Sequence, residues 1–491
     1  MSAFSGIGYL VMGAVTYGNK HDASTASNRQ FKAFRCLWGV ATLFHLAHSD
    51  LFGTRFHYIL MTLVAVWIIF KPATGLFLLL ISLQLVDAFD NMPVTSNHWL
   101  FTAFVNITIL QALLYHVVKN KSFRVEESRW LETFAPVVRI EVLILYFYAV
   151  FHKINAGFFT PASSCATELL KAQHLDAVIP LSPAVFMANA YFTLFVEAAI
   201  PILLCFRRTR NWGGLLGVVF HFILAYSSYN AFFDFSSMVF ALYALFISPG
   251  FFVTLMDGGR KLKQVLSREA PPAFSPARLL MLLGFWLAAM VAVLFITRRL
   301  YVPLSYYWYA FWTGYGLLCI ALLGWFMRTK AGRQANETAS LSFSVPGTFF
   351  LLVPILVFLN GLSPYLGLKT ENSFSMFSNL RTEGNVTNHY LVPVSLQVFD
   401  YQKDVVEIVS STDSVLQKTA AENKIWVFFE FKNYVAKRKP ARVTYIRNGQ
   451  RQEFVLQAAA PGDELLTRDL LMGKLLRFRP FRKTEPQPCG H

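Results

Sequence analysis

The chain has 491 residues, of which 55% are hydrophobic and only 15% are charged, a balance too apolar for a soluble domain. Its formal net charge is +16, from 44 lysines and arginines against 28 aspartates and glutamates. No basic surface with interleaved aromatic residues stands out, so we predict no nucleic-acid partner and expect the positive charge to lie beside anionic lipid headgroups.

The first thirty residues are expected to form a cytoplasmic or interfacial segment, residues 1–30. The first twenty are mildly apolar, but no basic region precedes them and no small-residue cleavage site follows. A signal peptide is therefore not predicted.

Residues 31–362 are predicted to form an all-α polytopic membrane domain with about eleven apolar segments. The second and third segments are separated only by Lys71-Pro72, so they are either two tilted spans or a re-entrant pair. The predicted segments are 34–52, 56–70, 73–89, 99–118, 137–154, 184–206, 212–226, 231–249, 279–297, 305–327 and 346–362.

Basic residues in the connecting loops predict the orientation of these segments. The loops on one side carry fifteen lysines and arginines, at 119–129, 207–210, 260–278 and 328–333. The opposite loops carry four, which are Arg55, Lys171, Arg298 and Arg299. Since basic loops mark the cytoplasmic side, we expect a cytoplasmic N-terminus and an outer location, periplasmic, extracellular or lumenal, for residues after 362.

Residues 363–491 are predicted to form a small β-rich extracytoplasmic domain. The alternation of Trp426 to Phe431 is typical of a half-buried strand. The strongest signal is a hairpin, in which the runs 441–447 and 451–456 flank Asn448-Gly449, a dipeptide that tolerates the positive φ angles of a type I′ turn.

The five cysteines predict neither a disulfide framework nor a metal site. Cys36, Cys205 and Cys319 fall in predicted spans, Cys165 in an outer loop and Cys489 near the C-terminus. His45 and His48 would share a helix face, but two ligands without a third do not make a convincing site, so we predict no metal.

The residues best suited to chemistry are His152 and Lys153, at the end of a strongly apolar run. A charge near membrane depth is costly, so such a lysine must reach the interface, pair with a partner or face a functional cavity. Desolvation also disfavours the charged form of a lysine, which turns an inert ammonium into a usable base.

The run YFYAVFHKINAGF, from Tyr146, resembles a helix of the vitamin K-dependent gamma-carboxylases and their bacterial relatives, the horizontally transferred transmembrane (HTTM) family. Lys153 falls on the second position of the family's basic dipeptide, and His152 stands where the carboxylases have lysine. Three further stretches are similar to family segments. These are Thr95 to Leu100, the run from Val219 through His221 and Asn230 to Ile247, and Asn360-Gly361-Leu362 followed by Phe374 to Phe377.

This resemblance implies a quinol-dependent carboxylase, a lyase that couples oxidation and epoxidation of a hydroquinone to carboxylation of glutamate side chains. It implies reduced vitamin K or another hydroquinone as cofactor, CO2 and O2 as co-substrates, and a glutamate-containing protein or peptide as partner, besides membrane lipid. Lys153 would be the base, helped by His152, while Asn97 and His98 would hold a quinol oxygen or its anion. Asn155, His221 and Asn230 would contact substrate or cofactor.

Each of these residues also has a structural interpretation. Lys153 could reach the membrane interface, His98 could open a helix, and His221 could bond to a neighbouring helix. Glu197 and Asp234 are expected to make interior polar contacts, whereas Glu141 is expected to pair with Arg139.

Two other functions stay open on the sequence alone. One is a quinone- or lipid-binding membrane protein with a redox or lipid-modifying role, and the other is a non-catalytic scaffold whose outer β domain binds a partner.

Overall fold

The computed structural model describes residues 5–49, 55–174, 179–228, 232–258, 304–329, 332, 341–460 and 462–490. These residues divide into two compact units. Unit 1 comprises 1–72, 204–226 and 232–341, and unit 2 comprises 73–203, 227–231 and 342–491. The boundary predicted at residue 362 does not separate the units, because the C-terminal sheet belongs to the same unit as residues 73–203.

Six helices in the described part of the chain are long and apolar enough to cross a membrane, which is compatible with a multi-pass membrane protein. The eleven predicted segments are not all reproduced as spans. Three of them form helices of only 15, 15 and 11 residues, and the segment 279–297 lies outside the described residues. The six helices are Thr74–Asn91, Asn97–Asn120, Glu127–Phe151, Pro183–Cys205, Tyr307–Arg328 and Thr348–Leu366.

Unit 1 is helical in its described part. Helix α1 packs on α2 and α9, and α8 packs on α9 and α12. The predicted interfacial segment and the first predicted span are continuous, because α1 runs unbroken for 45 residues. The helices are α1 (Ser5–Ser49), α2 (Phe56–Phe70), α8 (Arg210–Leu224), α9 (Phe233–Tyr243) and α12 (Leu304–Arg328).

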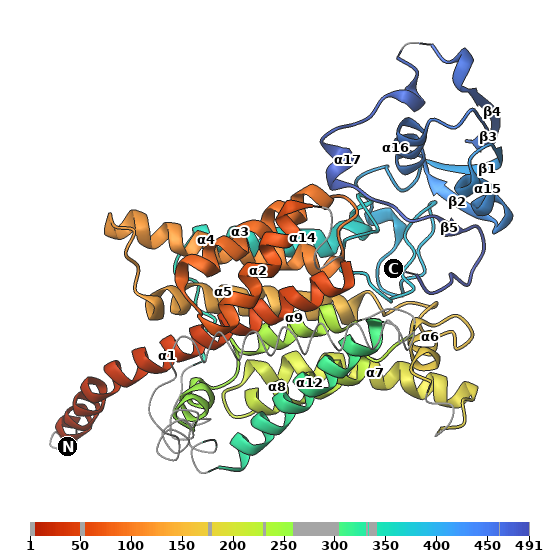
Figure 1. Cartoon of the computed structure of the whole chain (residues 1–491). Coiled ribbons are helices and arrows are strands. Elements are labelled where there is room, and N and C mark those ends of the chain that lie inside the picture. The colour runs from red at the N-terminus through yellow and green to blue at the C-terminus, as the bar shows by residue number, and fades with distance from the viewer. Residues whose placement is uncertain are drawn as a thin grey trace. The chain divides into compact units, whose positions relative to one another are not determined.

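Unit 2 contains a bundle in which α4 (Asn97–Asn120) packs on α3 (Thr74–Asn91) and α5 (Glu127–Phe151), and α14 (Leu352–Leu366) packs on α4 and α5 (Figure 1). The 3₁₀ turn η2 (Thr348–Leu351) leads into α14. Gly361 allows the close approach of α14 to α5, since a Cβ there would overlap the ring of Tyr148. The unit also includes α6 (Cys165–Ala172) and most of α7 (Pro183–Cys205).

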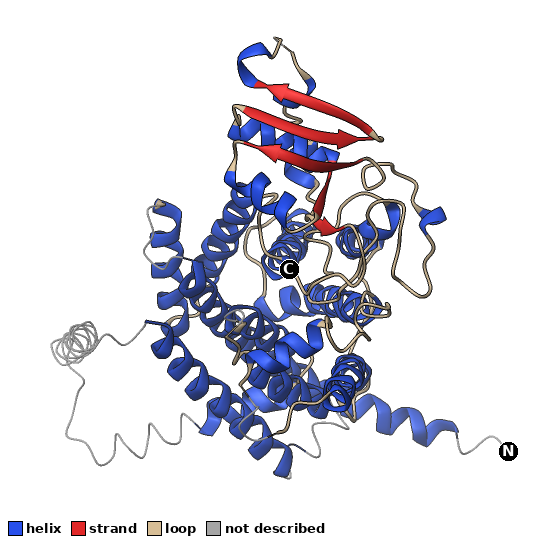
Figure 2. Cartoon of the chain, turned by 90° about the vertical axis from the view of Figure 1, so that its right-hand side faces the viewer, coloured by secondary structure: helices blue, strands red, loops and turns tan. Residues whose placement is uncertain are grey.

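A five-stranded antiparallel sheet with the order β4-β3-β1-β2-β5 lies toward the C-terminus (Figure 2). Its strands are β1 (Val405–Ser411), β2 (Lys424–Val427), β3 (Arg442–Arg447), β4 (Gln450–Val455) and β5 (Phe481–Arg482). Helices α15 (Ser414–Ala421) and α16 (Phe428–Arg438) pack on β1 and β2. Buried side chains such as Val406, Leu416, Phe431, Val443 and Phe454 form the core between them.

The predicted hairpin is confirmed. Strands β3 and β4 pair in register from Arg442 with Val455 to Arg447 with Gln450, around Asn448 (φ 52°) and Gly449 (φ 76°).

The strand predicted over residues 426–431 is half wrong, because β2 ends at Val427 and α16 begins at Phe428. Phe428, Phe431 and Val435 are buried at the spacing of a helix face. The six residues 426–431 are too few to distinguish this spacing from the alternation of a strand.

The remaining short turns connect these elements. They are η3 (Val394–Leu396), η4 (Leu456–Ala458), η5 (Glu464–Leu466) and α17 (Met472–Leu475).

Candidate functional site

Helix α5 ends at the motif that sequence analysis singled out. Phe151 is its last residue, and the backbone N–H groups of Lys153 and Ile154 then donate to the carbonyls of Val150 and Phe151 in a tight turn. This turn sends the side chains of two consecutive residues, His152 and Lys153, to different neighbours.

Lys153 forms a buried ion pair with Glu197 of α7. Its Nζ lies 3.0 Å from Oε1 and 2.8 Å from Oε2 of Glu197, and it also donates to the carbonyl of Ala149 at 2.9 Å. The two side chains are only 7% and 13% exposed. Lys153 is therefore paired with a carboxylate rather than extended into solvent, and the prediction of an interior polar contact for Glu197 is confirmed.

The surroundings of the pair are apolar and aromatic. The ring centroid of Phe158 lies 6.0 Å from the Lys153 Nζ. Phe158 packs in a small cluster with Phe159, Ala190 and Leu194, the last two from α7. Low polarity strengthens the attraction between an ammonium and a carboxylate and makes an unpaired charge there costly.

His152 contacts other neighbours than Lys153 does and is fully buried. Its Nε2 lies 3.2 Å from the carbonyl oxygen of Ser373, and its Nδ1 lies 2.8 Å from the hydroxyl of Tyr365. A carbonyl only accepts, so Nε2 carries the hydrogen and the neutral ring accepts from Tyr365 at Nδ1. Both ring nitrogens are satisfied, which makes His152 a positioning residue for the 373 backbone.

Three asparagines bond to the same stretch of backbone. The Oδ1 of Asn97 accepts from the N–H of Phe374 at 2.7 Å. The Nδ2 of Asn360 donates to the carbonyl of Asn372 at 2.9 Å, and the Nδ2 of Asn155 donates to those of Ser378 at 2.6 Å and His152 at 2.7 Å. We call Asn97, His152, Asn155 and Asn360 the polar clamp, because they hold residues 372–378 against the ends of α4, α5 and α14.

The clamped segment is conformationally strained. Asn372, Phe374 and Phe377 in this segment, and Asn379 directly after it, all have positive φ angles, between 51° and 63°. Phenylalanine rarely adopts this left-handed conformation, which costs on the order of 1–3 kcal/mol per residue. The bonds from the polar clamp supply the surrounding structure that such a backbone needs.

His389 joins a second segment to the end of α5. Its Nε2 donates to the carbonyl of Phe151 at 2.9 Å, and its Nδ1 accepts from the N–H groups of Leu391 and Val392, both at 3.1 Å. Burial lowers the pKa of His389 below the usual range of histidine, consistent with this neutral tautomer.

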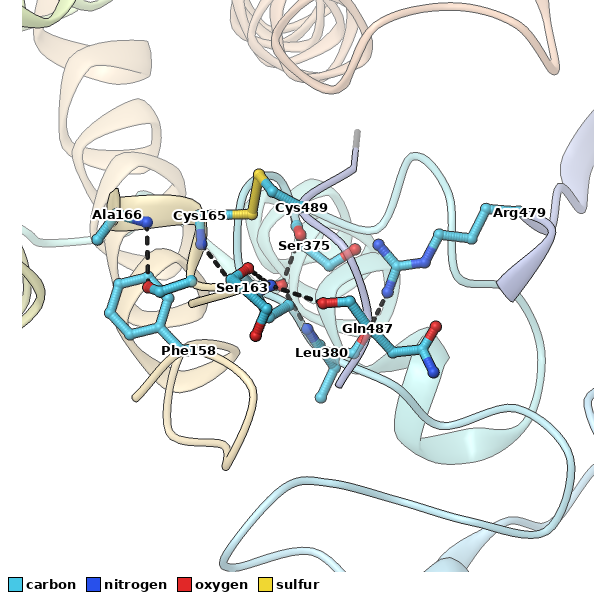
Figure 3. Close-up of a disulfide and its surroundings, with 12 residues drawn as sticks. Phe158, Ser163, Cys165, Ala166, Ser375, Leu380, Arg479, Gln487 and Cys489 are labelled. Carbon is cyan, nitrogen blue, oxygen red and sulfur yellow. Dashed lines mark hydrogen bonds between the residues drawn. A yellow bond between two sulfur atoms is a disulfide. The ribbon is translucent and has the colours of Figure 1, made fainter. Parts of the chain in front are cut away.

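A disulfide joins Cys165 to Cys489, 324 residues later (Figure 3). Asn379 connects its two sides, since its Oδ1 accepts from the N–H of Cys165 at 2.7 Å and its Nδ2 approaches the carbonyls of Ser163 at 2.9 Å and Gln487 at 3.4 Å. The expectation that no disulfide follows from the cysteines is corrected here. Nothing in the spacing of two cysteines so far apart indicates that they meet.

Comparison with known proteins adds no family to this geometry, because no family model, curated protein or solved structure matches the chain. The resemblance to the carboxylases stays a prediction from the four short stretches named in the sequence analysis.

The other predicted residues are placed as follows. His98 is buried in α4 with its Nε2 3.2 Å from the hydroxyl of Ser96. His221 belongs to unit 1, where it is buried near the rings of Phe235 and Tyr243. Asn230 lies outside the described residues.

Among the predicted carboxylates, Asp234 makes the expected interior contact, with its Oδ2 3.7 Å from Nδ1 of His45 within unit 1. Glu141 is fully buried and accepts a hydrogen bond from Thr108. Its expected partner Arg139 instead donates to the carbonyl of Ser342, so the predicted pair between Glu141 and Arg139 is wrong.

The sequence did not predict that Glu197 pairs with Lys153 or that hydrogen bonds from the polar clamp hold residues 372–378. Glu197 is the acidic residue within an otherwise apolar span, which is the signal that could have suggested it as a counter-ion. The run of asparagines and serines over 372–379 was a weaker signal, because such residues are also typical of an exposed loop.

Proposed function

We propose that the protein is an integral membrane enzyme that oxidises a hydroquinone, reduced vitamin K or a related quinol, and couples this to carboxylation of glutamate side chains with CO2 and O2. The observation that carries the proposal is the buried contact between Lys153 and Glu197. Two titratable groups in contact within apolar surroundings are costly to maintain and are characteristic of sites that move protons.

A lysine that acts as a base must be neutral when its substrate arrives. Glu197 offers a way to reach that state, because a proton that passes from the ammonium to the carboxylate leaves an amine beside a carboxylic acid. In a low-dielectric setting the neutral pair competes with the ion pair, since neither charge then needs solvation. Lys153 would then accept a phenolic proton, and Glu197 would position the amine and share the charge.

The residues around the pair fit a hydroquinone. The amine and carboxylate suit a phenolic O–H, and the rings of Phe158 and Phe159 suit an aromatic nucleus. On the same helix as Glu197, Phe192 and Phe195 are exposed, which suits access for a ligand dissolved in lipid. When bound and deprotonated, the quinol would supply the oxygen-dependent strong base that removes the weakly acidic γ-proton of glutamate.

We further propose that the N-terminus is cytoplasmic and that residues after 362 lie on the outer side. The unequal distribution of basic residues among the loops supports this orientation. The disulfide between Cys165 and Cys489 supports it independently, because disulfides persist in oxidising compartments. A cysteine placed at the exposed turn residue Asn448 should react with an impermeant thiol reagent on intact cells or spheroplasts, and protection until lysis would overturn the orientation.

The activity is tested with the full chain in lipid nanodiscs, with reduced vitamin K, oxygen, labelled bicarbonate and a glutamate-containing peptide. We expect quinol consumption and label fixed in the peptide. Quinol consumption without label in the peptide would indicate a redox enzyme that does not carboxylate. Quinol that is bound but not consumed would indicate a binding protein. No quinol binding at all would favour a scaffold.

A further inference from the structure

Large exposed apolar side chains in the C-terminal part of the chain gather in two short segments. Among the described residues after 366, only Val409 and Val415 lie elsewhere. We call the residues in the two segments the apolar rim; they are Val386, Tyr390, Leu391, Leu396, Val398, Phe399, Leu470, Leu471 and Leu475. So uneven a distribution differs from the scattered single hydrophobic residues of an ordinary protein surface.

The segment 470–475 is attached to the end of α3. The Nζ of Lys474 lies 3.3 Å from the carbonyl oxygens of both Phe89 and Asp90 and 5.3 Å from the ring centroid of Phe89. Nearby, Arg477 donates to the carbonyl of Pro93 at 3.5 Å. Phe89 is itself 68% exposed at the end of a helix apolar enough to cross a membrane, and Leu470 is 83% exposed.

The segment 386–399 is attached in the same way to the ends of α5 and α14. Besides the bond from His389 to Phe151, the N–H of Tyr390 donates to the carbonyl of Ile154 at 3.1 Å. The N–H of Phe399 donates to the carbonyl of Leu366 at 3.0 Å. Each contact is made where an apolar helix ends.

These helix ends belong to one side of the bundle. Helices α3 and α5 are joined through α4, so the end of α3, the beginning of α4 and the end of α5 face the same way. The polar clamp ties the beginning of α4, the end of α5 and the last turns of α14 to a single segment. If these helices cross a membrane, this is the level at which they leave the hydrocarbon.

We propose that the apolar rim inserts into the lipid leaflet around the ends of α3, α5 and α14. Leucines and Tyr390 would occupy the boundary between acyl chains and headgroups, where amphipathic anchors and aromatic rings are favoured. Lys474 would extend its apolar stem along Phe89 while its ammonium stays with the carbonyls that end α3. The partner is lipid, because both rim segments are bonded to the ends of helices that are apolar enough to cross a bilayer. The proposal does not depend on quinol chemistry.

The experiment measures depth with a fluorescent label in the full chain. Cys36, Cys205 and Cys319 are replaced by serine, the disulfide is kept, and an environment-sensitive fluorophore is attached to Leu471→Cys or, in a second protein, Leu391→Cys. The control is Val415→Cys, an exposed apolar position on α15 away from the rim. Each protein is reconstituted in phosphatidylcholine bilayers. Quenching of the fluorophore is then measured in two ways, with brominated acyl chains in the bilayer and with iodide in the aqueous phase.

We expect the brominated lipid to quench the labels at 471 and 391 several-fold more than the label at 415, and iodide to show the reverse order. Equal iodide quenching at 471, 391 and 415 would overturn the proposal. A label at 471 that is shielded from both quenchers would also overturn it, because protein rather than lipid would then cover the rim. Native-like intrinsic fluorescence melting of each labelled protein establishes that it is folded.

Discussion

The two sides of the turn that ends α5 differ in how their polar groups are satisfied. On one side the polar clamp makes hydrogen bonds to backbone groups, and the second ring nitrogen of His152 is satisfied by the hydroxyl of Tyr365. On the other side Lys153 and Glu197 satisfy each other with charge, next to the ring of Phe158. A group saturated by backbone bonds is suited to fixing a shape, whereas a charged pair is suited to exchanging a proton. We therefore propose a structural role for the clamp and a chemical role for the pair.

The strongest response should appear in activity. Lys153→Arg keeps the positive charge, yet a guanidinium stays protonated at any usable pH and cannot act as a base. We expect quinol oxidation to fall by about 10²- to 10⁴-fold, the usual contribution of a general base. Steady-state quinol oxidation in nanodiscs measures this, with Lys171→Arg in an exposed ion pair as the matched control. Wild-type turnover by Lys153→Arg would reject Lys153 as the base.

The next largest effect is expected on the free energy of unfolding. It tests whether Lys153 and Glu197 stabilise each other or whether Lys153 is buried without a stabilising partner. Lys153→Met leaves the Glu197 carboxyl without its partner, so we expect a loss of about 3–5 kcal/mol in the free energy of unfolding. Lys153→Met combined with Glu197→Gln should recover much of that loss. Reversible unfolding in mixed micelles with SDS gives the double-mutant cycle. Additive losses would mean that the two side chains do not interact.

Lys369, which lies outside the predicted spans, tests how much the burial of a lysine ammonium costs. Burial removes solvation from its ammonium and lowers the pKa of Lys369 to about 8. Between about pH 8 and pH 10 the unfolded chain binds more protons than the folded one, so stability should rise with pH by about 3 kcal/mol in all. Lys369→Met should remove this slope and stabilise the protein at pH 7, as measured by unfolding at a series of pH values. A slope that the variant retains would assign the effect to another group.

The clamp should show a purely structural response. Asn155→Ala leaves the carbonyls of His152 and Ser378 and the N–H of Phe158 without their partner, so we expect a loss of about 2 kcal/mol. Quinol oxidation per folded molecule should change far less than in Lys153→Arg. The control is Asn120→Ala, at the exposed end of α4. A loss of quinol oxidation at unchanged free energy of unfolding would show that Asn155 takes part in the reaction and is not only structural.

The smallest effect is expected in the hairpin. Gly449 has a φ of 76°, and a Cβ added there would meet no heavy atom within 4 Å, so only backbone strain opposes a side chain. Gly449→Val should cost about 1–2 kcal/mol and increase proteolysis near the turn. Gly490→Ala, which is equally uncrowded but lacks a positive φ, should have no such effect. Equal protease resistance of the two variants would contradict the turn's role.

Features with local signals could be predicted without the structure. Apolar runs indicated membrane helices, since hydrocarbon requires about twenty apolar residues per span. The dipeptide Asn448-Gly449 predicted the hairpin, because few residues tolerate two consecutive positive φ angles. Lys153 stood out for a similar reason, as a charge at the end of an apolar helix.

Which groups meet became visible only in the folded chain. Lys153 and Glu197 are 44 residues apart, His152 and Ser373 are 221 apart, and Cys165 and Cys489 are 324 apart. No local pattern encodes such pairings, because they depend on how α5, α7 and α14 pack. Packing also gives two consecutive residues different partners. After the tight turn that ends α5, His152 bonds to the backbone of Ser373, whereas Lys153 pairs with the carboxylate of Glu197.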